Sequence, residues 1–484
     1  MSCLIILPII IAIGLGVSIS YIKFESDEKV AKYAIISSFI VAIIAISVLF
    51  LCYGETFVLF EFNKELTLGF HIDGIAVIFA GMVSVLWPIA TIYASKYMIH
   101  DGGFVKFFTF YILTFGIVLG TAFSNNLFVL YVFYEALTFI TLPLVIHNNE
   151  RRDIYSGKKY LIYSVGGAAV SFMGMMIFVV NVGSFDFAGA TMTTINSELL
   201  LAYVLMFMGF SVKAGIFPCH DWLISAGVAP TTVTALLHAV AVVKAGSYAV
   251  IRVTYSLYNP VLLRGTFAQY FVMTMIIATI VFGSLMAMKS KHIKRRLAFS
   301  TVSQLSYILL GIACMSNIGL TGAFLHMINH AFIKIVLFYV AGNVVFTTHK
   351  EYIKEIEGFG KKMKTTFLCF TLCSLSLMGI PPFGGFFSKF ALAQGAIGVG
   401  GFIGFLAVVA LMMSAVFTAM YLLQLIAIAY VTHVDFDHSK LDKVEEAPKE
   451  MVFSIVILTA IMIAISLGSM PLYNFIQNMI GGII

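Results

Sequence analysis

The fold of this chain is indicated by GFSVKAGIFPCHDW (Gly209–Trp222), an apolar stretch that carries a lysine and is interrupted by glycine and proline. A second stretch, GIPPFGGFFSK (Gly379–Lys389), has the same character. Glycine and proline disrupt the hydrogen-bond ladder of a helix, which a membrane tolerates only where the freed backbone groups face protein or a water-filled cavity. Interrupted helices at corresponding positions in two halves of a chain are typical of transporters built from inverted repeats.

The composition of the whole chain is that of a membrane protein. Its 484 residues are 61% hydrophobic and only 11% charged, whereas a soluble domain carries roughly 25% charged residues. The net charge of +6 requires no nucleic-acid partner, because membrane proteins keep an excess of lysine and arginine on their cytoplasmic loops. The first apolar run lacks a basic leader and a clear cleavage site, so we interpret it as a retained span and not as a signal peptide.

The apolar runs predict an all-α polytopic membrane protein with about 14 transmembrane helices. The predicted spans are 3–22, 30–53, 72–95, 105–123, 126–146, 158–181, 199–225, 230–253, 265–289, 293–315, 319–346, 365–396, 400–431 and 450–470. The two interrupted stretches fall in the seventh and twelfth spans, so spans 4–8 and 9–13 would form two inverted five-helix repeats. The predicted domains are 1–104 with the first three helices, 105–253 and 265–431 with the repeats, and 450–484 with the last helix.

One short segment departs from the helical pattern. Glu55–Asp73 (ETFVLFEFNKELTLGFHID) alternates apolar and polar residues on either side of Asn63-Lys64. This alternation predicts a β-hairpin. In the span model it lies on the side of the membrane opposite the first loop.

The basic residues are distributed asymmetrically. Of the 29 lysines and arginines, 22 fall in loops that follow odd-numbered spans, for example within Lys289–Arg296, and the opposite side has only Lys64, Arg252 and Arg264. Because basic loops remain in the cytoplasm, this pattern predicts a cell-membrane (inner-membrane) protein with both termini on the outer side.

The four remaining basic residues lie inside predicted spans. They are Lys213, Lys244, Lys334 and Lys389, and among the acidic residues only Glu135 lies well within a span. A lysine at the bilayer centre costs about 2.5–3.5 kcal/mol on insertion scales. Glu135 could neutralise one of these lysines in a structural ion pair, but it cannot neutralise four. We therefore expect the set to be functional.

Lysine and histidine together suit a proton relay. The proton affinity of a lysine amine responds to burial and to a nearby carboxylate, and histidine titrates near neutral pH. His326, His330 and Lys334 are spaced i, i+4, i+8, so they share one helix face over about 12 Å. His238 and Lys244 are about 120° out of phase on a straight helix, so a relay through both requires an irregularity or a bridging water.

At this point several stretches resemble the antiporter-like, proton-pumping subunit family of respiratory complex I, Mrp antiporters and membrane-bound hydrogenases. They are KAGIFPCHDWLISAGVAPTTVTALLHAVAVVKAGSYAVIRV (Lys213–Val253), YVFYEALTFITLPLVIH (Tyr131–His147), IKRRLAFSTVSQLSYILLGI (Ile293–Ile312), HMINHAFIKIVLFYVAGNV (His326–Val344) and SLMGIPPFGGFFSK (Ser376–Lys389). The matches cover most of the chain between residues 70 and 470, in the order typical of the family.

The resemblance implies a role for each intramembrane charge. Glu135 on helix 5 would pair with Lys213 on helix 7, and Lys244 with His238 would form the central relay on helix 8. His326, His330 and Lys334 would be the relay of helix 11. Lys389 would be the terminal group of helix 12, where some members have glutamate. Lys244, the segment EEAPKEM (Glu445–Met451) and the lack of a long lateral helix resemble the Mrp and hydrogenase branch.

The function implied is translocation of H⁺, coupled to redox chemistry or Na⁺ exchange in partner subunits. We expect no cofactor and no metal in this chain, since Cys369 and Cys373, one helical turn apart, suit apolar packing. Expected partners are antiporter-like and small hydrophobic membrane subunits, with a hydrogenase or dehydrogenase arm where redox energy is used. Alternatives are the D-type subunit of an Mrp Na⁺/H⁺ antiporter, an independent solute transporter and a scaffold subunit that has lost pumping.

Overall fold

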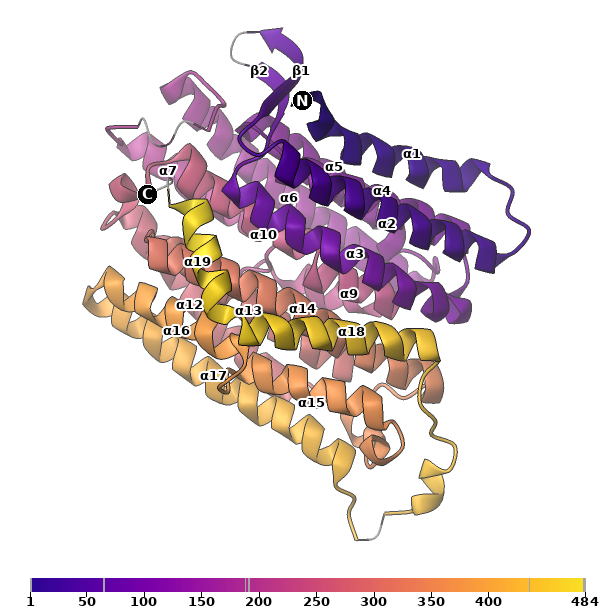
Figure 1. Ribbon diagram of the computed structural model, residues 1–484. Coiled ribbons are helices and arrows are strands. Elements are labelled where there is room, and N and C mark those ends of the chain that lie inside the picture. Colours follow the sequence, from indigo (N-terminus) through magenta and orange to yellow (C-terminus); the bar gives the residue numbers. More distant parts are fainter. Residues whose placement is uncertain (1, 64–65, 188, 190–191, 435, 482–484) are drawn as a thin grey trace.

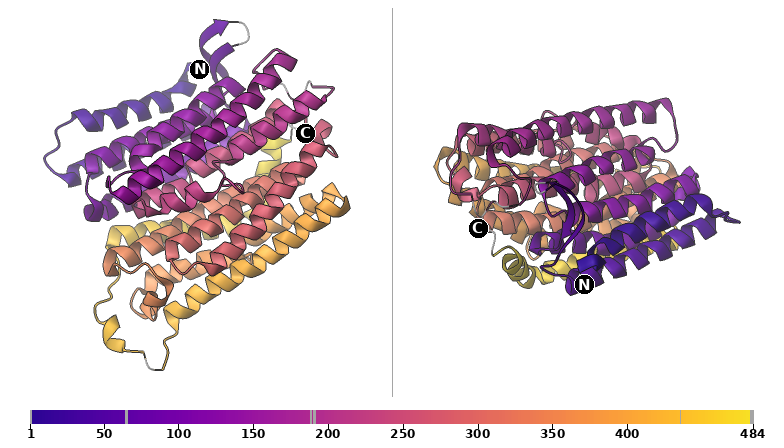
Figure 2. Two further views of the ribbon diagram at one scale, coloured as in Figure 1. Left: turned by 180° about the vertical axis from the view of Figure 1, so that it is seen from behind. Right: turned by 90° about the horizontal axis from the view of Figure 1, so that it is seen from above.

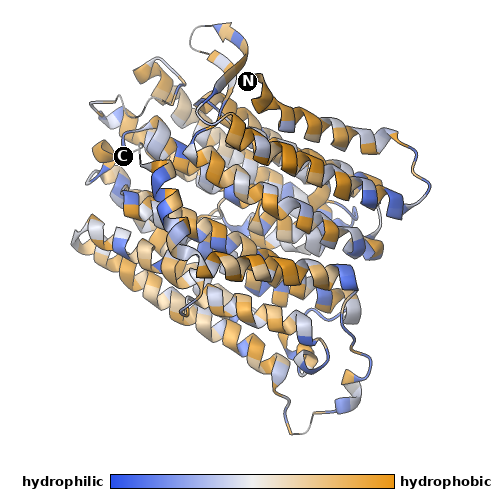
Figure 3. Cartoon of the chain, viewed as in Figure 1, coloured by the Kyte–Doolittle hydropathy of each residue, from blue (hydrophilic) through white to orange (hydrophobic). Residues whose placement is uncertain are grey.

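A computed structural model describes residues 2–63, 66–187, 189, 192–434 and 436–481. Long helices lie side by side in one bundle, with α1 (Leu7–Tyr21) and α2 (Asp27–Leu51) at one edge and α16 (Gly384–Val399) and α17 (Gly401–Tyr430) at the other (Figure 1). Two further views show the same bundle from behind and from above (Figure 2). Apolar residues dominate the helices, and hydrophilic residues gather towards helix ends and loops (Figure 3).

The other elements follow in chain order. Up to the middle of the chain they are β1 (Thr56–Asn63), β2 (Leu66–His71), α3 (Gly74–Asp101), α4 (Phe104–Ala122), α5 (Leu127–Val145), α6 (Arg151–Val182), α7 (Ser197–Ser211), α8 (Asp221–Ser225), α9 (Thr231–Ala239) and α10 (Val242–Ile251). The remainder are a π-helical turn (Arg252–Leu257), α11 (Pro260–Leu263), α12 (Phe267–Lys289), α13 (Ile293–Ala313), α14 (Asn317–Thr348), α15 (Lys364–Met378), α18 (Lys449–Leu467) and α19 (Ser469–Ile480).

The predicted class, an all-α protein with many membrane spans, is confirmed. Within the described residues, 12 helical segments are long and apolar enough to cross a membrane, and α7 and α15 are shorter apolar helices. The segment Thr231–Leu257 and helix α13 are buried over their whole apolar windows. These two elements therefore lie at the centre of the bundle, where side chains can be kept away from lipid.

The predicted hairpin is present as antiparallel strands β1 and β2, although Lys64 of the expected turn lies outside the described residues. Phe70 bridges to Ser124 in the turn between α4 and α5, and the His71 amide donates to the Phe123 carbonyl at 2.7 Å. The hairpin is thereby fixed to the ends of the helices, beyond the bundle (Figure 1).

Both predicted interruptions are present. Helix α7 ends at Ser211 and the chain resumes a helix at α8, while α15 ends at Met378 and α16 begins at Gly384. Gly215 and Gly379 have φ angles of +74° and +88°, a conformation that strongly favours glycine. The indole Nε1 of Trp222 donates to the Val212 carbonyl at 2.8 Å, which satisfies a backbone group freed by the first break.

A third interruption was not predicted. The span expected as one helix over 230–253 is divided between α9 and α10. The amides of Val240 and Ala241 both donate to the Leu236 carbonyl, at 3.1 and 2.9 Å. This shared acceptor is a π-type bulge, which accommodates one extra residue in the turn. The local sequence contains neither proline nor glycine at this point, so it gives no signal for the bulge.

The last predicted span, 450–470, is present as helix α18, and a further helix, α19, follows it. Helix α18 ends at Leu467, and α19 continues in a different direction after Gly468 (Figure 1).

Three basic residues at the edges of predicted spans, which were counted with the loop charges, are buried instead. Arg252 is 2% exposed in the π-helical turn, where its guanidinium pairs with both carboxylate oxygens of Asp73. Lys294 and Arg296 are 7% and 3% exposed near the start of α13. The Arg296 guanidinium donates to the carbonyls of Ser290, just after α12, and of Tyr421, within α17, so its buried donors are paired.

Candidate functional site

The first intramembrane charge pair joins α5 to the break after α7. The Lys213 Nζ atom lies 4.0 Å from Glu135 Oε1 and donates a hydrogen bond to the carbonyl oxygen of Tyr134. It also lies 3.4 Å from the centroid of the Tyr134 ring, a cation–π contact. Lys213 is fully buried, whereas the side chain of Glu135 is 17% exposed. The predicted pairing of these two residues is therefore present, with Tyr134 as an additional partner.

A small residue lets the break approach the next lysine-bearing helix. A Cβ atom built on Gly246 of α10 would lie 2.9 Å from the Lys213 Cβ and 2.8 Å from the Ala214 amide nitrogen. Gly246 follows Lys244 by two residues, so the backbones that carry Lys213 and Lys244 are in contact. No hydrogen bond joins the two amines in the described part of the chain.

The central pair joins α10 to α14. The Lys244 Nζ atom lies 3.0 Å from His330 Nδ1, and both residues are fully buried. His238, before the bulge, instead hydrogen-bonds the Leu223 carbonyl at 3.1 Å through Nε2. The irregularity required between His238 and Lys244 exists, but it does not join the two side chains directly.

Helix α14 carries the predicted line of His326, His330 and Lys334, each at most 1% exposed. The two imidazole centroids are 6.1 Å apart. At one end Lys334 Nζ donates to the Ser300 hydroxyl at 2.7 Å and the Leu297 carbonyl at 3.0 Å, both on α13. The line therefore extends from Lys334 towards the other end of the helix.

The last lysine lies at the second interruption. Lys389 Nζ donates to the Leu377 and Met378 carbonyls at the end of α15, at 2.6 and 2.9 Å. It lies 5.5 Å from the centroid of the Tyr307 ring, and that ring is 5.3 Å from His326. The neighbouring Ser388 hydroxyl lies 3.1 Å from His326 Nδ1. Helices α14 and α16 are thereby joined through His326.

The structure also places residues at the site that the sequence analysis did not identify. Tyr134 holds Lys213, Ser300 holds Lys334, and Tyr307 and Ser388 lie between His326 and Lys389. Ser300 and Tyr307 belong to the quoted stretch Ile293–Ile312 and are spaced i, i+7, on one helix face. That spacing could have identified them as partners of the helix that follows.

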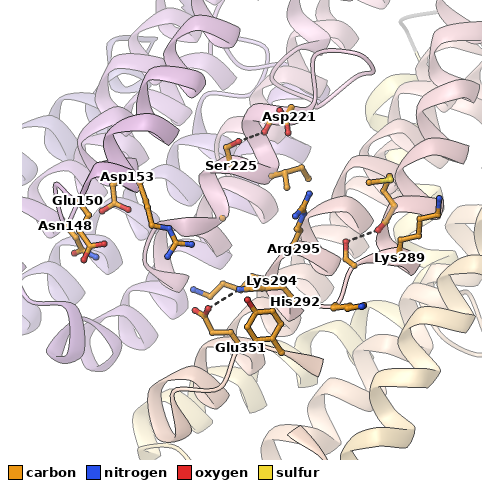
Figure 4. A pocket seen from close by; sticks show the side chains of 17 residues that line it. Asn148, Glu150, Asp153, Asp221, Ser225, Lys289, His292, Lys294, Arg295 and Glu351 are labelled. Carbon is orange, nitrogen blue, oxygen red and sulfur yellow. Dashed lines mark hydrogen bonds and ion pairs between the residues drawn. The ribbon is translucent and has the colours of Figure 1, made fainter. Parts of the chain in front are cut away.

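A pocket of about 770 Å³ opens at the ends of the helices, on the side with the basic loops. Glu150 and Asp153 lie on one wall, and Lys289 and Arg295 lie across from them (Figure 4). His292 hydrogen-bonds Glu351 at 3.1 Å, and this bond holds the pKa of the Glu351 carboxyl below its usual value.

Two lining residues of the pocket are adjacent to the buried line. Ile224 follows Leu223, the partner of His238, and Lys294 precedes Leu297, the partner of Lys334, by about one helical turn. The lining of the pocket is therefore close in sequence to the backbone partners of His238 and Lys334.

No three His, Cys, Asp or Glu side chains gather closely enough to hold a metal ion in the part of the chain that the structure describes. Cys369 and Cys373 are buried in α15, and the Cys373 sulfur lies 3.8 Å from the Thr459 hydroxyl of α18. Both cysteines pack between helices.

Known proteins are similar to this chain in sequence and in fold. Residues 124–418 match the family described as NADH:quinone oxidoreductase/Mrp antiporter, TM, and residues 61–108 match the N-terminus of chain 5 of NADH-ubiquinone oxidoreductase (complex I). A similar curated protein, Na(+)/H(+) antiporter subunit A1 of Staphylococcus aureus (strain JH9), is 29% identical over 428 residues, which are 83% of this chain and 52% of the relative. The chain thus spans about half the length of the curated relatives it matches.

Two solved structures have the same fold. One is the membrane-bound sulfane sulfur reductase, an archaeal respiratory membrane complex, with a TM-score of 0.83 and 23% identity over 98% of this chain and 95% of that chain. The other is the Mrp complex from Dietzia sp. DQ12-45-1b, with a TM-score of 0.83 and 20% identity over 98% of this chain and 51% of that chain. With the match over residues 124–418, these likenesses place the chain among the antiporter-like membrane proteins of the NADH:quinone oxidoreductase/Mrp antiporter family.

Proposed function

We propose that this chain is the proton-translocating subunit of a multisubunit, energy-coupling membrane complex. Protons move within the membrane between Glu135–Lys213, Lys244–His330 and Lys389. The energy comes from redox chemistry or from Na⁺ exchange in partner subunits. The observation that carries the proposal is the Lys244–His330 hydrogen bond at 3.0 Å. It joins two fully buried titratable groups without a carboxylate, at the centre of the line.

The chemistry of the line favours H⁺ over Na⁺. A hard cation such as Na⁺ is held by several oxygen ligands, whereas lysine and imidazole nitrogens make up most of this line. Glu135 is the one carboxylate among the proposed transport residues, and it is already paired with Lys213. Where Na⁺ moves, it binds in another subunit.

The pocket at the basic loops provides aqueous access to this line. Ile224 and Lys294 of its lining are close in sequence to Leu223 and Leu297, the backbone partners of His238 and Lys334. Both acidic and basic residues line it, which suits the collection of protons from the adjacent water. In the cell membrane, the basic loops then face the cytoplasm and the hairpin faces the outside.

The relatives support a role within a complex. The similar proteins include an antiporter subunit, a respiratory membrane complex and an Mrp complex. This chain accordingly acts beside other antiporter-like and small hydrophobic subunits, with or without an oxidoreductase arm. A D-type role in an Mrp antiporter without redox partners is the second candidate, because of the resemblance around Lys244.

The proposal is tested with the native complex, purified and reconstituted in liposomes. Lys213→Met should abolish coupled ion transport while the assembled complex remains intact, because the variant keeps the volume of the side chain but removes its proton site. A matched control is Lys32→Met, since Lys32 is 68% exposed and lies outside the line. Transport that persists in Lys213→Met at the level of the control contradicts the proposal.

A further inference from the structure

Helix α13 presents three polar side chains along one face. Ser300, Gln304 and Tyr307 are spaced i, i+4, i+7, within about 60° of one another on an α-helix. The two outer residues contact α14, Ser300 through Lys334 at 2.7 Å and Tyr307 through His326 at 5.3 Å between ring centroids. Gln304 is the middle residue of this face and is fully buried.

The antiparallel register of the two helices places Gln304 opposite His330. Ser300 lies beside Lys334, and Tyr307 lies beside His326. Further along, a Cβ on Gly311 would lie 2.9 Å from the Cβ of Ala323. Each step forward on α13 thus corresponds to a step backward on α14. The middle residue of one series, Gln304, therefore faces the middle residue of the other, His330.

Several buried polar atoms at and near this level have no hydrogen-bond partner from the described part of the protein. Both amide atoms of Gln304 and the Nε2 atoms of His330 and His326 have no hydrogen-bond partner within the described part of the chain. An unpaired buried polar group costs about 1–3 kcal/mol. Buried polar groups in native proteins are therefore almost always paired, with water where the protein supplies no partner.

Glutamine has the right chemistry for holding water in a proton path. Its amide offers two donors and one oxygen acceptor, and it does not ionise. It can therefore orient water molecules towards an imidazole without trapping a proton itself. A gap remains in the line at this place, because Lys244 bonds His330 and Lys334 bonds Ser300, but no direct bond joins the two pairs.

We propose that Gln304 holds bound water against His330 and so completes the proton path between the Lys244–His330 pair and the Lys334–Ser300 pair. Gln304 is a positioning residue, since it acts through water and does not carry the proton. The inference rests on the proposed proton-translocating function. It adds a connection that the charged residues alone do not make.

The test compares Gln304→Leu, Gln304→Asn and Gln304→Glu in the whole complex, reconstituted in liposomes. Gln304→Leu should lower transport by tenfold or more, while the assembled complex melts at the same or a higher temperature because no hydrogen bond to the protein is lost. Gln304→Asn should recover part of the rate. Gln304→Glu should give a pH profile of transport that differs from the parent, because the new carboxyl titrates beside His330.

A matched control separates this role from a structural one. Gln269 of α12 is also buried, but its amide is paired, with Nε2 donating to the Ala313 carbonyl and Oε1 accepting from the Gly265 amide. Gln269→Leu should lower the melting temperature and keep the transport rate per assembled complex. Parental transport in Gln304→Leu overturns the inference, and so does a loss of transport that only follows a loss of stability.

The two proposals fail in distinguishable ways. Lys244→Met, measured in the same preparation, tests the proton line itself. Parental transport in Lys244→Met overturns the proposed function. Loss of transport in Lys244→Met together with parental transport in Gln304→Leu keeps the proposed function and overturns the water site.

Discussion

The two interrupted helices each hold a lysine, but the partners of the two lysines differ in kind. Lys213 lies beside a carboxylate, Glu135, and against the face of Tyr134. Lys389 has two backbone carbonyls at the end of α15 instead, where a helix carries roughly half a negative charge. A carboxylate can move or take up a proton, whereas the end of a helix cannot. The first interruption can therefore be regulated and the second is fixed.

The largest effect should come from removing the adjustable partner. Glu135→Gln leaves the fully buried Lys213 without a counter-charge, and loss of one partner from a buried pair is strongly destabilising. We expect coupled transport in liposomes to fall by at least about tenfold, which corresponds to about 1.4 kcal/mol of barrier. The double variant with Lys213→Met should recover thermal stability and stay inactive. Recovery of transport in the double variant would show that the pair has only a structural role.

A second substitution tests whether the fixed lysine must release a proton. Lys389→Arg keeps a positive charge that can donate to the same carbonyls of α15, but arginine is not deprotonated in proteins. Assembly and melting temperature should remain near the parental values, and transport should fall by about tenfold. Lys389→Arg with parental transport would instead assign Lys389 the role of a permanent charge.

The smallest effects concern the glycines beside each lysine. A Cβ at Gly246 would meet the backbone of Ala214 and the Lys213 Cβ at 2.8 and 2.9 Å, so Gly246→Ala should displace Lys213 and cost about 1–3 kcal/mol. At Gly379 the nearest atom to the Cβ would be the flexible Cδ of Lys389, at 3.0 Å, but φ is +88°. Gly379→Ala should cost about 1–2 kcal/mol through backbone strain, with the smaller loss of transport.

Gly14 offers a control for the melting and transport measurements on the two glycine variants. A Cβ at Gly14 meets nothing within 4 Å, so Gly14→Ala should leave melting and transport unchanged. If Gly379→Ala impairs transport more than Gly246→Ala does, the contrast between an adjustable and a fixed lysine is wrong.

The sequence was sufficient to predict the features that depend on the chemistry of neighbouring residues. Apolar runs identified the membrane helices, glycine and proline marked both interruptions, and isolated lysines revealed the buried charges. Glu135 and Lys213 were paired from the resemblance and lie 4.0 Å apart. These signals are local, so one chain displays them without knowledge of its packing. The roles assigned to the line remain predictions.

The features that the sequence did not reveal depend on packing between distant segments. The bulge between α9 and α10 has no glycine or proline to mark it. Arg252 was counted with the loop charges because its partner, Asp73, is far away in the chain. The contacts of His330 with Lys244 and of Lys334 with Ser300 also require the register of whole helices. A pattern within one helix cannot supply that register.

The bulge at Val240 and Ala241 affects how many residues the segment from α9 to α10 can contain. Each residue of a helix turns the chain by about 100°. Because the bulge absorbs one extra residue, loss of one residue there would leave His238 and Lys244 near their present relative orientation. Loss of one residue elsewhere in α9 or α10 would instead rotate one half against the other. We therefore expect the bulge to be the place where this segment tolerates a change in length.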